Sequence, residues 1–175
     1  MPLEVAYYGN PMLRKKCEPI EKVTDEHRAL AKEMLARLRE WNAWGFSAPQ
    51  VHHPIRLFVV RMDPFLPDGS MQEGTPYVCI NPVLSDPATE MLLGDEGCCS
   101  VPGLRVPVIR PQSITVEALD INGEPFTFRP QDWHARLFMH ENDHLNGVLH
   151  IDRTDPKTRK RLEPALRKMK KKYNK

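Results

Sequence analysis

The sequence predicts an α+β fold in which a mainly antiparallel sheet packs around a central metal-binding helix, with a further helix at the C-terminus. Strand-like and helix-like segments follow one another without strict alternation, unlike the βαβ order of a parallel sheet. The dipeptide Asn122-Gly123 between two apolar stretches is the strongest short-range signal of a β-hairpin. The segment from His140 to His144 places two histidines one helical turn apart.

The first expected helix covers residues 24–42. Thr24 suits its N-cap, and Asp25 and Glu26 suit the positive end of the helix dipole in the first turn. Apolar side chains recur at helical spacing, namely Leu30, Met34, Leu38 and Trp41. We interpret this stripe as core rather than as a binding site.

Four expected strands come next, at residues 55–62, 77–84, 114–120 and 125–128. Pro82 cannot donate a backbone hydrogen bond, so we expect the second strand to lie at an edge or to end early. The last two strands flank the Asn122-Gly123 turn and should pair as a hairpin.

Two helices complete the expected fold. The first covers residues 131–146 and contains both histidines, with Gly147 as the residue that ends it. The second begins at Pro156 and carries Leu162, Leu166 and Met169 on one face. At 175 residues the chain is one domain's worth. We expect a catalytic domain at residues 1–154 and a basic helix at 155–175, either part of the same domain or an arm on it.

Composition favours a cytoplasmic protein. Residues 1–10 lack the basic patch and apolar run of a signal peptide, and no apolar stretch approaches the roughly 20 residues of a membrane span. Of the four cysteines two are adjacent, at 98 and 99, which suits a disulfide framework badly. Neither a membrane partner nor specific DNA binding is expected.

The net charge of +2 hides an asymmetry along the chain. Residues 155–175 contain ten Lys/Arg and two Asp/Glu, a local charge of +8, so residues 1–154 carry −6. An acidic body with a basic C-terminal helix indicates a polyanionic partner such as RNA or the ribosome. The other interpretation, a solvated terminal helix without a partner, remains open.

The histidine pair predicts a metal site. Histidines four residues apart lie on one helix face and can bind one ion, and Glu141 beside the first can accept a proton from a water there. Two residues compete as the third ligand. Residues 140–150 read literally as H-E-x-x-H-x-x-G-x-x-H, the metzincin protease pattern. In that pattern the third ligand is His150.

The alternative ligand is Cys98, and the context favours it. A metzincin also needs a methionine turn after its third histidine. The only later methionine, Met169, lies in a lysine-rich run typical of an exposed helix. One thiolate and two imidazoles leave a fourth position for water, as in a catalytic site.

Three segments occur in a fixed order: one ending Ala48-Pro49-Gln50, then residues 96–100 with the sequence EGCCS, then residues 140–144 with the sequence HENDH. This order resembles the peptide deformylase family, whose motifs are G-aliphatic-G-x-A-A-[P/T]-Q, E-G-C-aliphatic-S and H-E-x-D-H. The resemblance spans nearly the whole chain. It implies removal of the N-formyl group from the formylmethionine of nascent peptides, with release of formate.

The resemblance also implies a metal centre. Its ligands are Cys98, His140 and His144, its acid/base is Glu141, and Gln50 is an oxyanion donor. The ion in the family is ferrous iron in the cell, and Zn²⁺, Ni²⁺ or Co²⁺ is expected in a purified sample.

Further roles are expected around this centre. The backbone N–H of Cys99 is a second oxyanion donor. Glu96, held by Arg110, is expected to support a metal-bound histidine. Gly45 and Arg105 are expected to contact the substrate peptide, and for Arg105 the other interpretation, an ordinary surface arginine, remains open.

Motif one departs from the family pattern. Ala43 replaces its first glycine, Trp44 an aliphatic residue and Ser47 an alanine, while Cys99 replaces an aliphatic residue in motif two. If position 43 requires a positive φ, alanine is strained there. These changes concern loop shape and substrate affinity rather than the reacting groups.

A second class of function also fits the composition, a non-enzymatic RNA- or ribosome-binding protein whose metal site is structural. Glu141 argues against it, because a structural site has no use for a general base. Since no ligand or base occurs after His144 in the favoured assignment, deletion of residues 157–175 is expected to leave turnover of a short peptide largely unchanged.

Overall fold

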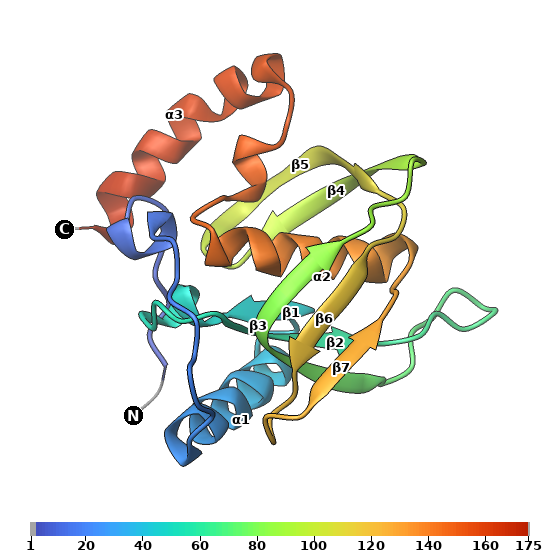
Figure 1. Cartoon of the computed structure of the whole chain (residues 1–175). Coiled ribbons are helices and arrows are strands. Elements are labelled where there is room, and N and C mark those ends of the chain that lie inside the picture. The colour runs from blue at the N-terminus through green and yellow to red at the C-terminus, as the bar shows by residue number, and fades with distance from the viewer. Residues whose placement is uncertain (1–2, 175) are drawn as a thin grey trace.

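The structure, a computed structural model, describes residues 3–174. Two sheets, three α-helices and short 3₁₀ helices make up this part of the chain (Figure 1). The elements in chain order are η1 Pro11–Arg14, α1 Asp25–Glu40, β1 Gly45–Ser47, η2 Ala48–Val51, β2 Leu57–Met62, β3 Thr75–Ser85, β4 Met91–Cys98, β5 Val101–Pro111, β6 Thr115–Leu119, β7 Pro125–Phe128, α2 Asp132–Leu145, η3 His150–Asp152 and α3 Pro156–Tyr173.

The larger sheet is antiparallel and has the strand order β1-β2-β3-β6-β7. The expected β6–β7 hairpin is present, and Gly123 takes the positive φ of 82° that its turn requires. The expected early end at Pro82 is wrong, because β3 continues to Ser85. Strand β2 pairs with β3 only as far as Ile80, so Pro82 lies where β6 is the single partner of β3, as an edge position requires. A register shift between Ile80 and Val83 interrupts the pairing with β6, so the missing N–H of the proline costs no ladder bond there.

Strand β2 is buried on both faces of the sheet, which explains its continuous apolar run. Phe58 and Val60 pack toward α2, whereas Leu57 and Val59 pack toward α1. The two side chains of each pair point the same way because successive residues of a strand alternate between its faces. Helix α2 is thereby fixed against the sheet, and it also contacts β5 of the smaller sheet (Figure 1).

The smaller sheet is the hairpin β4–β5, which sequence reasoning did not predict. Glycines at 94, 97 and 103 and prolines at 102, 107 and 111 interrupt the alternation by which strands are recognised. A register shift between Glu96 and Cys98 ends the regular pairing at the hairpin turn. This irregularity places Cys98 at the inner end of the hairpin, facing α2.

Helix α3 packs on the hairpin rather than standing free. Leu166 and Met169 are buried in a cluster with Val101 and Val106 of β5. The expectation of an exposed Met169 is therefore wrong, because the lysines occupy the other faces of an amphipathic helix. Among the described residues, no helix combines the length and apolarity that a membrane crossing needs.

Candidate functional site

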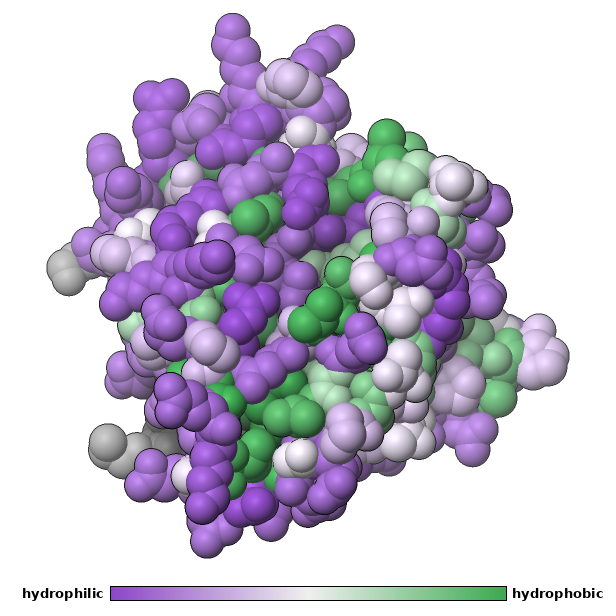
Figure 2. Space-filling model, in the orientation of Figure 1, coloured by the Kyte–Doolittle hydropathy of each residue, from purple (hydrophilic) through white to green (hydrophobic). Residues whose placement is uncertain are grey.

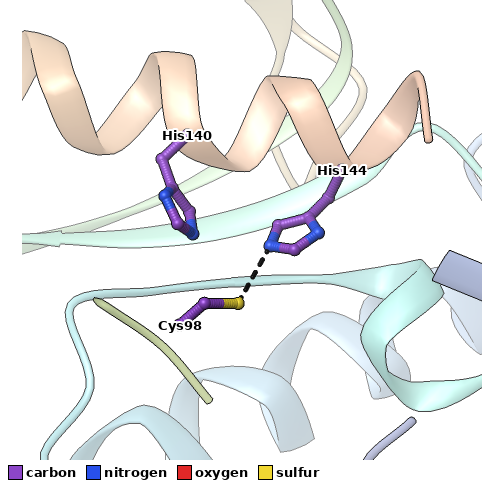
Figure 3. A group of neighbouring side chains, drawn as sticks. All are labelled: Cys98, His140 and His144. Atoms are coloured by element: carbon purple, nitrogen blue, oxygen red, sulfur yellow. Dashed lines mark hydrogen bonds between the residues drawn. The ribbon is translucent and has the colours of Figure 1, made fainter. Parts of the chain in front are cut away.

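Helix α2 presents His140, Glu141 and His144 from its buried interior, where none of the three is more than a tenth exposed. The two imidazole rings project from one face, with their centroids 5.1 Å apart (Figure 3). The spacing of four residues therefore has the geometric consequence that the sequence predicts.

Cys98 joins this pair from the end of β4 (Figure 3). Its Sγ lies 3.4 Å from Nε2 of His144, and one donor atom from each of the three residues lies within 4.8 Å of the others. One sulfur and two imidazole nitrogens form the donor set of a borderline-soft divalent ion such as Zn²⁺ or Fe²⁺. Three converging donors with this chemistry fit a metal ion.

His150, the competing third ligand, lies elsewhere. It is buried, and its Nε2 is 3.2 Å from the carbonyl oxygen of Leu104 on β5. Burial lowers the pKa of His150 to about 4, which keeps the ring neutral and able to donate to that carbonyl. Its ring packs 5.7 Å from that of His140, but it is not part of the converging group.

Glu96 and Arg110 form a buried ion pair that contacts the ring of His140. Arg110 donates from Nε and Nη2 to the two oxygens of Glu96, at 2.6 and 2.8 Å. Oε1 of Glu96 also lies 2.8 Å from Nδ1 of His140. Burial alone would raise the pKa of Glu96, but the hydrogen bonds from Arg110 and His140 outweigh it and hold that pKa well below its usual range. An ionised Glu96 accepts from Nδ1 and leaves Nε2 of His140 free to face Cys98.

Glu141 is buried without a complete set of partners. Its Oε2 has no hydrogen bond within the described part of the chain, an uncommon condition for a buried carboxylate. Burial raises the pKa of Glu141 to about 7, and the nearby His140 opposes that rise. A Cβ added at Gly45 would lie 2.6 Å from Oε1 of Glu141, so only glycine allows β1 to approach this closely.

Gln50 is buried and uses both ends of its amide. Oε1 accepts hydrogen bonds of 2.9 Å from the backbone N–H and the hydroxyl of Ser47. Nε2 points the other way, 3.0 Å from Oγ of Ser100, 3.1 Å from Sγ of Cys99 and 3.5 Å from Sγ of Cys98. The serine that departs from motif one thus holds Gln50 with its N–H donors toward the thiol.

Ala43, two residues before β1, does not have a positive φ and carries no such strain. The positive φ in this segment belongs to Asn42, at 48°, and asparagine tolerates that region better than alanine. Trp44 packs edge-on against Trp133 of α2, with ring centroids 6.5 Å apart.

A cavity of about 600 Å³ opens over these groups. Gly45, Gln50, Cys99 and Arg105 line it together with Cys98, His140 and Glu141. All three tryptophans of the chain, Trp41, Trp44 and Trp133, also line it. Trp41 therefore packs against the core, as its place in the apolar stripe predicts, and also lines the cavity.

Sequence reasoning missed several residues that complete the site. Arg136 and Asp143 lie on α2, and Ser100 follows the cysteine pair. Arg136 stands one helical turn before His140, and that spacing was the signal that could have found it. Arg105 is exposed at the rim and donates to the carbonyl oxygen of Asp95 at 3.1 Å.

Comparison with known proteins gives a consistent result. The family described as polypeptide deformylase matches residues 2–160. A peptide deformylase of Picosynechococcus is 40% identical over 154 residues, covering 88% of this chain and 80% of that protein. One of Borreliella burgdorferi is 37% identical over 166 residues, covering 94% of this chain and 96% of that protein.

Solved structures agree in fold. A plant peptide deformylase 1B superposes with a TM-score of 0.89 at 35% identity, covering 98% of this chain and 91% of the other. The peptide deformylase of Ehrlichia chaffeensis superposes with a TM-score of 0.88 at 30% identity, covering 97% of each chain. The similarity therefore includes both sheets and the three helices, not the motifs alone.

Proposed function

The chain belongs to the peptide deformylase family, and from this premise we propose that Cys98, His140 and His144 hold the metal ion on which its reaction depends. The reaction is removal of the N-formyl group from the formylmethionine of nascent polypeptides, with release of formate. The observation that carries the assignment is the convergence of Sγ of Cys98 with the two imidazoles, beside a carboxylate oxygen of Glu141 that has no partner among residues 3–174. When bound, the ion supplies Lewis acidity to a water and to the formyl oxygen.

Glu141 is the proton carrier. Its unpartnered Oε2 accepts a proton from the attacking water and then delivers it to the amine that leaves. Its position on the helix, beside His140 and behind Gly45, keeps the carboxylate at the reacting bond. A structural metal site has no use for such a group, so its presence favours the enzyme over the non-enzymatic alternative.

Gln50 and Cys99 stabilise the negative charge that develops on the formyl oxygen. The Nε2 group of Gln50 and the backbone N–H of Cys99 are the donors, and Ser47 holds the amide in orientation. A backbone donor tolerates any side chain, so the cysteine at position 99 is compatible with this role.

The remaining roles follow from position around the cavity. Gly45 lets β1 lie against Glu141 and lines the cavity in which the substrate backbone binds, and Arg105 at the rim contacts the peptide. Glu96, held by Arg110, orients the ring of His140 through Nδ1.

We propose Fe²⁺ as the ion in the cell. A thiolate with two imidazoles also suits Zn²⁺, Ni²⁺ and Co²⁺, and we expect one of these in protein purified in air. Because the substrate is a nascent polypeptide, the site of action that we propose is the cytoplasm.

Formate release tests the function. Anaerobically purified protein should release one formate for each formyl-methionyl peptide consumed. The rate of release should be proportional to the metal content, which should approach one ion per chain. The unformylated peptide is the matched control and should yield none. A protein with a full complement of metal and no formate release would instead support the non-enzymatic alternative.

We further propose that α3 docks on the ribosome. Its exposed basic side chains include Lys157, Lys160, Lys168 and Lys171, on the side opposite the buried Leu166. Figure 2 shows hydrophilic side chains crowded over the part of the surface where α3 lies. We also propose that residues 155–175 form one folding unit with residues 1–154, since Leu166 belongs to a shared core. For this reason charge reversal tests the docking better than deletion does.

The variant Lys160→Glu/Lys168→Glu/Lys171→Glu should bind ribosomes much more weakly than the native protein while turning over a short formylated peptide at a similar rate. Native binding should fall steeply with salt, because each phosphate contact releases counterions. The matched control reverses three exposed lysines outside α3, Lys15, Lys22 and Lys32. Co-sedimentation at low and moderate salt measures both. Equal binding by both variants would remove α3 as the docking surface.

A further inference from the structure

Arg136 is a buried arginine whose guanidinium lies between α2 and the β4–β5 hairpin; only 5% of the residue is exposed. Its Nη1 donates to Oε2 of Glu96 at 2.7 Å and to the carbonyl oxygen of Val108 at 2.8 Å. Its Nη2 donates to the carbonyl oxygen of Leu92 at 2.8 Å, and Nη1 also lies 3.4 Å from that of Gly94. One side chain of α2 is thus bonded to both strands of the hairpin.

The two elements that Arg136 joins carry the three donor residues. His140 follows it by one turn on α2, and Cys98 follows Glu96 by two residues on β4. Oε1 of Glu96 faces Nδ1 of His140, while Oε2 accepts a hydrogen bond from Nη1 of Arg136. The carboxylate is therefore held from both sides, by Arg110 on β5 and by Arg136 on α2.

We propose that Arg136 is a positioning residue for the metal centre: it holds the hairpin against α2, and through Glu96 it fixes the ring of His140. This inference rests on the proposed assignment of Cys98, His140 and His144 as ligands. Groups that orient a ligating histidine in this way typically contribute about 10- to 100-fold to metal affinity.

Position alone would also fit a substrate contact, because Arg136 lines the cavity and a cation there can bind a substrate carbonyl. The hydrogen bonds favour positioning. Both terminal nitrogens of the guanidinium donate to protein oxygens, and three of these are backbone carbonyls that cannot turn away. The two roles differ in what their loss changes, metal affinity in one case and KM in the other.

Gly94 offers a second way to disturb the same guanidinium. A Cβ added at Gly94 would lie 2.9 Å from Cζ and Nε of Arg136. The added methyl group would displace the guanidinium, because this group is the end of a flexible side chain. The backbone of the hairpin can keep its position. Gly94→Ala therefore displaces the charge without removing it.

The experiment compares the native protein with Arg136→Met, Gly94→Ala and a control, Arg129→Met, which removes an arginine bonded to Asp86 and Thr115, residues that belong neither to the converging group nor to the cavity lining. Co²⁺ is the probe. Its affinity is measured by competition with a chelator, and its ligand field is measured by visible absorption. The kcat and KM of the Co²⁺-loaded proteins are measured with a formylated peptide.

We expect Arg136→Met to bind Co²⁺ about 10- to 100-fold more weakly, with altered visible bands, a lower kcat and a nearly unchanged KM. Gly94→Ala should change affinity and spectrum in the same direction by a smaller factor, and Arg129→Met should match the native protein. If Arg136→Met binds Co²⁺ with the native affinity and spectrum, the inference is overturned. A lower melting temperature would then show a purely structural role, and a raised KM would show a substrate contact. If Arg136→Met does not fold, native Co²⁺ affinity in Gly94→Ala overturns it, and weakened affinity supports it. Absence of Co²⁺ binding in the native protein would instead contradict the proposed ligands.

Discussion

Cys98→Ala is expected to abolish stoichiometric metal binding, whereas His150→Ala should retain it. Removal of Sγ leaves two imidazoles on one helix, which is too few donors for a stable site. His150 faces the carbonyl oxygen of Leu104, so its loss opens a buried void and lowers stability without removing a ligand. Metal analysis of both variants after gel filtration, with thermal unfolding as the control for folding, measures the difference.

The reverse outcome would identify a different site. If His150→Ala loses its metal while Cys98→Ala keeps it, the chain uses the third histidine of the protease-like pattern, and the proposed ligand set is wrong.

Glu141→Gln is expected to bind metal normally and to lose about 10²- to 10⁴-fold in kcat, the usual contribution of a general acid/base. The amide preserves the size of the side chain behind Gly45, but it cannot accept a proton from water or return one to the leaving amine. Single-turnover formate release by metal-loaded protein is the measurement. Native turnover in such a sample would exclude Glu141 as the proton carrier.

Gln50→Ala provides the comparison for that variant. It removes an N–H donor instead of a proton acceptor, so it should lower kcat by about 10²- to 10³-fold with little change in KM. An increase in KM alone would make Gln50 a contact of the bound substrate rather than of the developing charge.

The regular part of the fold could be predicted because its signals are local. Helices α1 and α2 and the β6–β7 hairpin follow from apolar spacing and from Asn122-Gly123, and the structure has them within a few residues of the predicted ends. The β4–β5 hairpin could not be predicted, because its glycines and prolines remove the alternation that marks a strand. It forms because long-range packing against α2 and α3 compensates for weak local preference.

The sequence by itself determined that His140, Glu141 and His144 lie together on one helix, since 3.6 residues per turn place them within about one turn of each other. The sequence context favoured Cys98 over His150 as the residue that joins them, and the tertiary structure brings Cys98 rather than His150 into the converging group. Cys98 and His150 are both chemically suitable as a third metal ligand. They differ in position, because the β4–β5 turn carries Cys98 to the two histidines, whereas the segment after α2 directs His150 to the carbonyl oxygen of Leu104. Only the tertiary structure decided the contacts of Arg136 and Trp41, which resemble any helix arginine or core tryptophan in sequence. Their partners are far away in the chain, and contacts of that kind arise from the packing of whole surfaces, which no local spacing encodes.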